Sequence, residues 1–212
     1  MKEKEIEDEL VSIRSLMERS SKFISLSGLS GILAGVYALI GAGIANLLLN
    51  GQPVERTQTD IIEAVGSDYT AFSTFFYLII TALAVLIASL LTCYILSKQK
   101  AKRKNQAIWG RISRLLLFHM SVPLVSGGVL IFILLFRGHY GIIAPASLIF
   151  YGLSLVSASN FTFTLVKYLG LCEIILGLVA ACLPGYGLLF WAIGFGALHI
   201  IYGSLMYLKY DR

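Results

Sequence analysis

The sequence predicts an all-α polytopic membrane protein, a bundle of six transmembrane helices preceded by a short amphipathic helix in the cytoplasm. Of its 212 residues, 57% are hydrophobic and only 14% are charged, whereas a soluble domain is usually about one quarter charged. Six apolar segments reach or approach the roughly 20 residues that a helix needs to cross a hydrocarbon core. We therefore expect one transmembrane domain over 23–208 and a short cytoplasmic tail over 209–212.

The apolar segments are expected to be helices rather than barrel strands. Barrel strands alternate apolar and polar residues, but here the apolar runs are continuous, as in 78–91 and 129–136. In lipid, such a run satisfies its own backbone hydrogen bonds only as a helix. The expected spans are 23–49, 70–96, 115–136, 142–159, 163–183 and 187–208.

The positive charges predict the orientation. Of the 17 lysine and arginine residues, all but Arg56 and Arg137 lie on one side of the six spans. The basic side of a membrane protein normally stays in the cytoplasm, so both termini are expected there. The basic cluster over 98–104 is expected to attract anionic lipid head groups, and no nucleic-acid partner is expected.

The segment 1–22 is expected to form the amphipathic helix. Ile6, Leu10, Ile13 and Met17 recur along one face of a 3.6-residue period. The segment also carries six acidic residues, which does not fit a cleaved signal peptide. Such a helix either lies on the inner leaflet or docks on a cytoplasmic partner or a second copy of the chain.

Small residues mark the expected packing faces. Gly31 and Gly35 form a G-x-x-x-G motif in the first span, and Gly177 and Gly196 lie on small-residue faces of the last two. Small residues let helix backbones approach closely in lipid. The pattern predicts helix–helix contacts but does not say which helices meet.

Glu173 and His199 are the leading candidate site. Glu173 is the one carboxylate in any expected span, and ionisable groups inside a bilayer are costly and often functional. Glu173 lies about 12 residues before the middle of the turn over Pro184–Gly187 and His199 about 13 after it, so at 1.5 Å per residue they lie at similar depth. We expect them to meet directly or through one bridging group. Three interpretations remain open: a structural clamp, a proton-coupled site, and binding of a lipid or ligand head group.

His119 and Tyr151 are secondary candidates. His119 lies about one turn after Arg114, so we expect it to reach toward the cytoplasmic interface. A zinc site with Glu173 and His199 is not expected, because His119 is too shallow for ligands to converge near 2 Å. Tyr151 belongs to a stripe of hydroxyl residues that either forms interhelical hydrogen bonds or lines a polar cavity. The other members of the stripe are Ser147, Ser154 and Ser157.

The last third of the chain carries a resemblance. The segment from Tyr168 to Tyr210 is similar to small bacterial inner-membrane proteins without an assigned role. Its helix–Pro-Gly–helix layout also resembles the repeat of the HdeD-type acid-resistance membrane proteins. The layout rests on Gly177, Pro184-Gly185, Gly194 and Gly203. The resemblance implies six helices and a role in envelope stress.

No catalytic, cofactor or nucleotide motif is present in the sequence, and no G-x-S-x-G nucleophile motif occurs. We therefore expect no enzyme, no cofactor and no metal, and the lipid bilayer as the main partner. The leading hypothesis is a non-enzymatic inner-membrane protein with a structural, regulatory or envelope-stress role. The alternative is a small-solute or proton-coupled permease that uses Glu173 and His199; a membrane-embedded enzyme is disfavoured.

Overall fold

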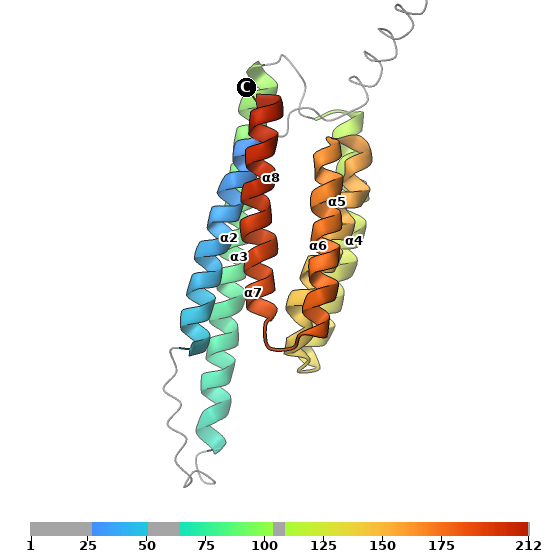
Figure 1. Cartoon of the computed structure of the whole chain (residues 1–212). Coiled ribbons are helices and arrows are strands. Elements are labelled where there is room, and N and C mark those ends of the chain that lie inside the picture. Colours follow the sequence, from blue (N-terminus) through green and yellow to red (C-terminus); the bar gives the residue numbers. More distant parts are fainter. Residues whose placement is uncertain (1–26, 51–63, 104–108, 212) are drawn as a thin grey trace, which may run out of the picture.

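The computed structural model describes residues 27–50, 64–103 and 109–211, and every element in these ranges is helical (Figure 1). The predicted amphipathic helix over 1–22 lies outside the described residues. The long helices are α2 (Gly28–Asn50), α3 (Ala64–Arg103), α4 (Arg111–Phe136), α5 (Ile143–Ala158) and α6 (Thr164–Cys182). The last helical stretch comprises α7 (Gly187–Trp191), η3 (Ala192–Leu198), α8 (His199–Met206) and η4 (Tyr207–Asp211).

Six helices in the described residues are long and apolar enough to cross a membrane. The all-helical class and the number of long apolar helices are therefore confirmed. Two short 3-10 segments complete the fold at the ends of α5: η1 (Tyr140–Ile142) before it and η2 (Ser159–Phe161) after it.

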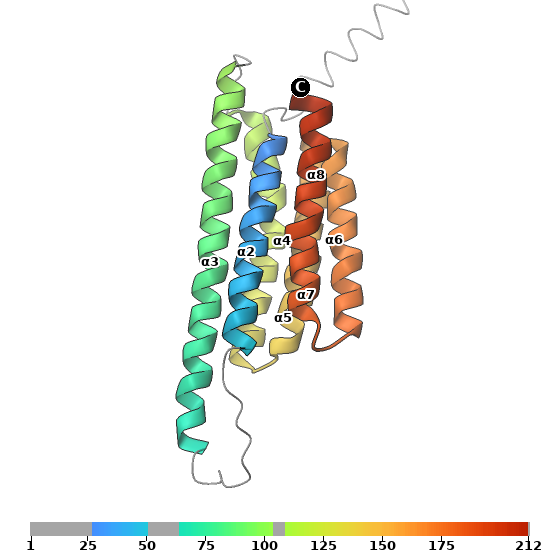
Figure 2. The same cartoon turned by 60° about the vertical axis from the view of Figure 1, so that its left-hand side comes forward.

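Helix α3, which contains the second expected span, is longer than predicted. The expected span covered 70–96, but α3 begins at Ala64 and ends at Arg103, so residues 64–69 are helical rather than part of a loop. Its candidate membrane span begins at Phe76, and its first turns extend beyond the ends of the other helices (Figure 2). Hydropathy predicts only the apolar part of a helix. Basic residues in the last turn of α3 also suit the negative end of the helix dipole.

The sequence predicts one regular helix for the last span, but the structure differs. The middle of this span, η3, is a π-helix that contains Gly194 and Gly196, and the predicted tail is helical through Asp211 in the second π-helix, η4. A π-helix closes its backbone bonds one residue further along the chain, so the turn is wider. Such segments often occur at functional sites.

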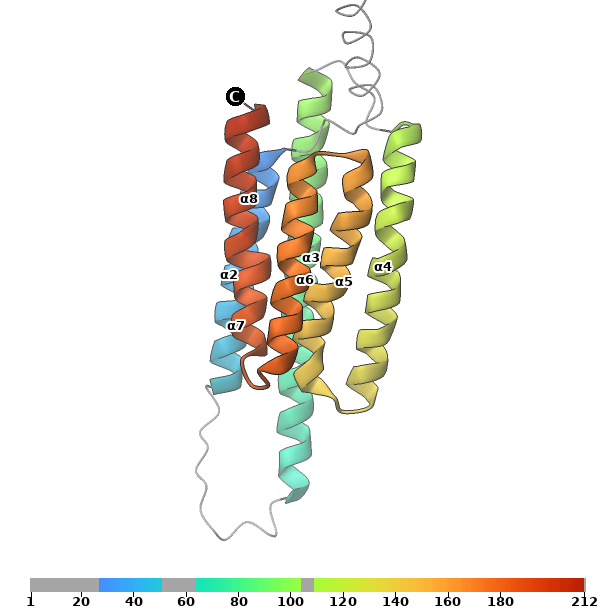
Figure 3. The same ribbon diagram turned by 45° about the vertical axis from the view of Figure 1, so that its right-hand side comes forward.

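The six helices form two layers of three (Figures 1 and 3). In one layer, α5 packs between α4 and α6; in the other, α2 packs between α3 and the last helical stretch. The turn after α6 crosses from one layer to the other, and Gly185 within it has a φ of 97°. Only glycine adopts this left-handed conformation readily.

Glycine closes the contacts within each layer. A Cβ atom added at Gly35 of α2 would lie 2.6 Å from the carbonyl oxygen of Gly196, and one at Gly31 would lie 3.1 Å from the Cα atom of Gly203. In the other layer, a Cβ atom at Gly152 of α5 would lie 2.6 Å from the carbonyl oxygen of Gly170 on α6. At Gly35 and Gly152 the backbones are therefore too close for any side chain, and at Gly31 the neighbouring backbone would have to give by a few tenths of an ångström.

Candidate functional site

Glu173 is fully buried on α6, with an exposed fraction of 0%. It shares a buried face with Gly170, Gly177 and Ala180, as the helical spacing predicts. A Cβ atom at Gly177 would lie 2.7 Å from Ile149 and 3.0 Å from Leu148 of α5. The small residues thus draw α6 against α5 and carry the carboxyl group into the bundle.

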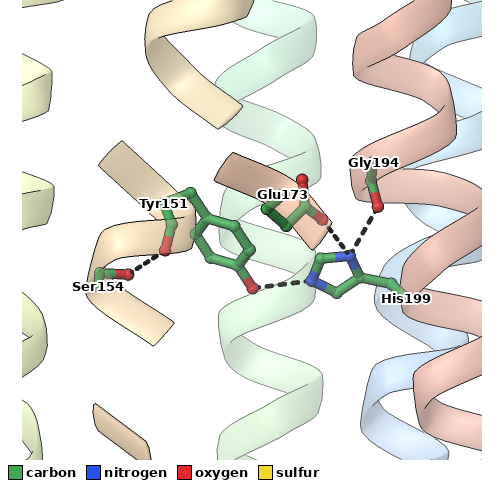
Figure 4. Close-up of polar contacts among 5 residues, drawn as sticks. All are labelled: Tyr151, Ser154, Glu173, Gly194 and His199. Carbon is green, nitrogen blue, oxygen red and sulfur yellow. Dashed lines mark hydrogen bonds and ion pairs between the residues drawn. The ribbon is translucent and has the colours of Figure 1, made fainter. Parts of the chain in front are cut away.

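His199 is the first residue of α8 and is 6% exposed. Its Nδ1 atom lies 3.5 Å from Oε1 of Glu173 (Figure 4). The two side chains therefore meet directly, as the residue counts on each side of the turn predict. They come from different layers, because α6 packs mainly on α5 whereas α8 packs mainly on α2.

Gly194 of η3 fixes the orientation of the imidazole ring. Its carbonyl oxygen lies 3.0 Å from Nδ1 of His199, five residues away along the chain. A carbonyl oxygen can only accept, so Nδ1 carries a proton and donates it to this bond. In a neutral ring the remaining nitrogen, Nε2, is then an acceptor.

Tyr151 of α5 completes a chain of three polar side chains. Its hydroxyl lies 2.8 Å from Nε2 of His199 and donates to it when the imidazole is neutral. The phenol ring also packs against the imidazole, with ring centroids 5.4 Å apart, and against Phe195, with centroids 5.0 Å apart. One turn further along α5, Ser154 donates a hydrogen bond to the backbone carbonyl of Tyr151 (Figure 4).

Both carboxyl oxygens of Glu173 are buried and have no hydrogen-bond partner among the described residues. Buried polar atoms are nearly always paired, so each exception needs an explanation. Gly194 again shapes this environment, because a Cβ atom there would lie 2.5 Å from Oε2 of Glu173. The carboxyl group therefore occupies space that exists only beside a glycine.

His119 takes no part in this site. It is exposed on α4, where its ring stacks on Phe161 with a centroid distance of 4.9 Å and an interplanar angle of 29°. In the described part of the chain, no three His, Cys, Asp or Glu side chains come together in a way that could hold a metal ion. The arrangement of Tyr151, His199 and Glu173 is suited instead to holding or passing a proton.

Sequence reasoning missed Gly194 as a member of the site. It named Gly194 only as part of a repeat-like layout and did not foresee that a π-helix would turn the carbonyl oxygen toward His199. The spacing Gly194-x-Gly196 shortly before a histidine in an apolar segment is the only signal that pointed there. Tyr151, by contrast, was indicated by its hydroxyl stripe.

Comparison with known proteins gives no family for this chain. No protein-family model, no curated protein and no solved structure matches it. The resemblance to bacterial inner-membrane proteins and to the HdeD-type repeat therefore stays a prediction.

Proposed function

We propose that the chain is an integral, multi-pass protein of a bacterial inner membrane. The outward surface supports this proposal, because 0% and 6% of the residues in the apolar stretches of α3 and α4 are buried. A soluble monomer rarely exposes a contiguous apolar patch larger than a few hundred Å². The exposed side chains of α3 include Phe76, Ile79, Ile80, Leu83, Leu86, Ile87, Leu90 and Leu91.

Both termini are proposed to lie in the cytoplasm. The end of α3, the start of α4, the start of α6 and the C-terminus lie at the same end of the bundle (Figures 1 and 2). This end carries Lys98, Lys100, Lys102, Arg103, Arg111, Arg114, Lys167 and Lys209. Arg137 is the one lysine or arginine at the opposite end in the described part of the chain. The orientation is tested by fusing reporters to each terminus: a cytoplasm-active fluorescent reporter should be bright at both ends, and an externally active phosphatase silent.

The proposed role is non-enzymatic and structural or regulatory: the centre formed by Tyr151, His199 and Glu173 fastens the two layers together. The observation that carries this proposal is the meeting of three polar side chains from α5, α8 and α6. The Tyr151 hydroxyl lies 2.8 Å from Nε2 of His199, and Nδ1 of His199 lies 3.5 Å from Oε1 of Glu173. Polar contacts between helices persist in lipid because a polar group without a partner is unfavourable there. A role in envelope stress, implied by the HdeD-type resemblance, is compatible with such a centre.

The test is the Glu173→Gln variant, examined in detergent and in liposomes. If the three side chains hold the two layers together, the variant unfolds at a lower temperature than the unmodified protein, and neither protein carries a proton-dependent flux. Ser154→Ala is a matched control, because Ser154 is buried on α5 and bonds only to the backbone of its own helix. An unchanged melting temperature in Glu173→Gln would contradict the proposal.

A small-solute or proton-coupled permease is the second candidate. The observation that favours it is the buried carboxyl group of Glu173, whose two oxygens have no hydrogen-bond partner among the described residues. Ionisable residues of this kind serve in proton pathways of transporters. This candidate predicts the opposite result: Glu173→Gln keeps its melting temperature and loses a proton-dependent flux into liposomes.

A further inference from the structure

The Tyr151–His199–Glu173 centre differs from an ordinary set of interhelical hydrogen bonds in its continuity. The tyrosine hydroxyl contacts one imidazole nitrogen at 2.8 Å, and the other nitrogen lies 3.5 Å from the carboxyl oxygen. A hydroxyl and an imidazole can each accept a proton on one side and release one on the other. The three groups thus follow one another from α5 to α6, with a hydrogen bond between Tyr151 and His199 and a 3.5 Å contact between His199 and Glu173.

Burial increases steadily along this path. Tyr151 is half-buried, His199 is 6% exposed and Glu173 is 0% exposed. Tyr151 is therefore the least buried member of this series, and the carboxyl group is its closed end. The other titratable side chains that act electrostatically on Tyr151 are Tyr202 of α8 and Cys93 of α3, and neither carries a positive charge to offset a carboxylate.

The charge balance requires one proton at the closed end. A carboxylate beside a neutral imidazole would be a lone negative charge in an apolar interior, which is very costly. With one proton added, the pair is neutral overall, either as a carboxylic acid beside imidazole or as a carboxylate beside imidazolium. The hydrogen bond from Nδ1 to the Gly194 carbonyl is kept in both forms.

We propose that Glu173 and His199 together bind a single exchangeable proton, and that the Tyr151 hydroxyl is the group through which this proton enters and leaves. On entry, a proton from water adds to the Tyr151 oxygen while the original hydroxyl proton moves to Nε2 of His199. The imidazolium so formed keeps Nδ1–H on the Gly194 carbonyl and has the Glu173 carboxylate beside it as its counter-ion. Tyr151 ends as a neutral phenol, so one proton has been taken up and no other bond has changed. This inference depends on the placement of α5, α6 and α8 in lipid under the proposed function.

The test follows proton exchange at the centre by infrared spectroscopy of the full chain in lipid nanodiscs after transfer into D₂O. Deuteration shifts both the C=O band of a protonated carboxyl and the ring bands of histidine, so either location of the proton is visible. The bands are assigned by their loss in Glu173→Gln and His199→Gln. We expect Tyr151→Phe, which keeps the ring but lacks the hydroxyl, to slow this exchange at least tenfold.

Tyr168→Phe is the matched control, because Tyr168 is a tyrosine of α6 that is 61% exposed rather than buried at the centre. It should exchange at the rate of the unmodified protein. Equal rates in Tyr151→Phe and the unmodified protein would overturn the proposal. So would a spectrum of Glu173→Gln that still shows every exchangeable band of the unmodified protein. The melting temperature of each variant reports separately on the fastening role, so failure of one proposal is distinguishable from failure of the other.

A second measurement covers the case in which Tyr151→Phe does not fold. Biosynthetic replacement of tyrosine by 3,5-difluorotyrosine preserves the ring and the hydroxyl but makes the hydroxyl more acidic. If the phenol carries the proton, exchange at the centre should become several-fold faster. An unchanged rate would also overturn the proposal.

Discussion

The contacts within each layer and the contact between the layers are built from different chemistry. Within the layers, α2 meets the last helical stretch and α5 meets α6 along glycines whose backbones nearly touch, at Gly35 and Gly196 in one layer and at Gly152 and Gly170 in the other. Between the layers, Glu173 meets His199 through side-chain atoms, and Tyr151 joins them. The first kind of contact depends on the absence of side chains, and the second depends on three particular ones.

This difference has consequences for how each contact fails. A glycine contact gains its stability from dispersion between close backbones, so any added atom opens it and no change of protonation affects it. A contact between a buried carboxyl group and an imidazole depends on one proton and on both partners being present. The layers should therefore be stable units, and the contact between them should be the part that responds to chemistry.

The largest expected effect is that of His199→Leu. The substitution leaves Glu173 buried without its partner, and removing one member of a buried ion pair costs roughly 3–5 kcal/mol. Thermal unfolding in detergent should therefore shift to a clearly lower temperature. If the variant unfolded at the temperature of the unmodified protein, the polar centre would have no part in joining the layers.

Gly35→Ala tests the contact within a layer. The new Cβ atom would lie 2.6 Å from the backbone oxygen of Gly196, which cannot move aside as a side chain would, so we expect a loss of about 1–3 kcal/mol. Gly43→Ala is the matched control on the same helix, because nothing lies within 4 Å of its Cβ position. Gly43→Ala should be neutral or up to about 1 kcal/mol more stable. Equal stability of the two variants would contradict the close approach of α2 to η3.

Gly194→Ala sharpens the comparison, because Gly194 belongs to a helix of one layer but faces the centre between the layers. Its Cβ atom would lie 2.5 Å from Oε2 of Glu173 and from Leu148. Both are flexible ends of side chains, so the loss of stability should be about 1 kcal/mol. The ¹⁵N resonances of His199 should shift as Glu173 moves, whereas Gly128→Ala, with open space around its Cβ position, should leave them unchanged.

The smallest expected effect on stability is that of Tyr151→Phe. It removes one hydrogen bond between helices, a contact worth about 0.6 kcal/mol on average in lipid. Tyr168→Phe serves as a control, since Tyr168 is 61% exposed on α6. A loss above about 3 kcal/mol in Tyr151→Phe would show that the hydroxyl contributes far more than a single hydrogen bond.

The sequence predicted the parts of the molecule that depend on periodicity. The six apolar helices follow from hydropathy, and the burial of Glu173 follows from the small residues at Gly170 and Gly177. The meeting of Glu173 and His199 follows from nearly equal residue counts on each side of a tight turn. These features are local, or are related by a short connection of known reach.

The features that the sequence did not predict depend on interactions between distant segments. The π-helix at Gly194 has no hydropathy signal, and the hydrogen bond between Tyr151 and His199 joins residues 48 positions apart. The sequence also did not predict that α6 and the last helical stretch belong to different layers. A short connection makes two helices neighbours, but it does not determine which other helix each of them contacts most extensively. The length of α3 was underestimated because its ends are polar.

A double-mutant cycle on Glu173→Leu and His199→Leu, measured by unfolding in detergent, tests most directly whether these two side chains join the layers. If they do, the two losses of stability are strongly non-additive. The double variant, in which two apolar side chains replace the pair, then recovers at least about 1 kcal/mol of the summed loss. Losses that add to within about 0.5 kcal/mol would mean that Glu173 and His199 act independently, and the proposed connection between the layers would be wrong.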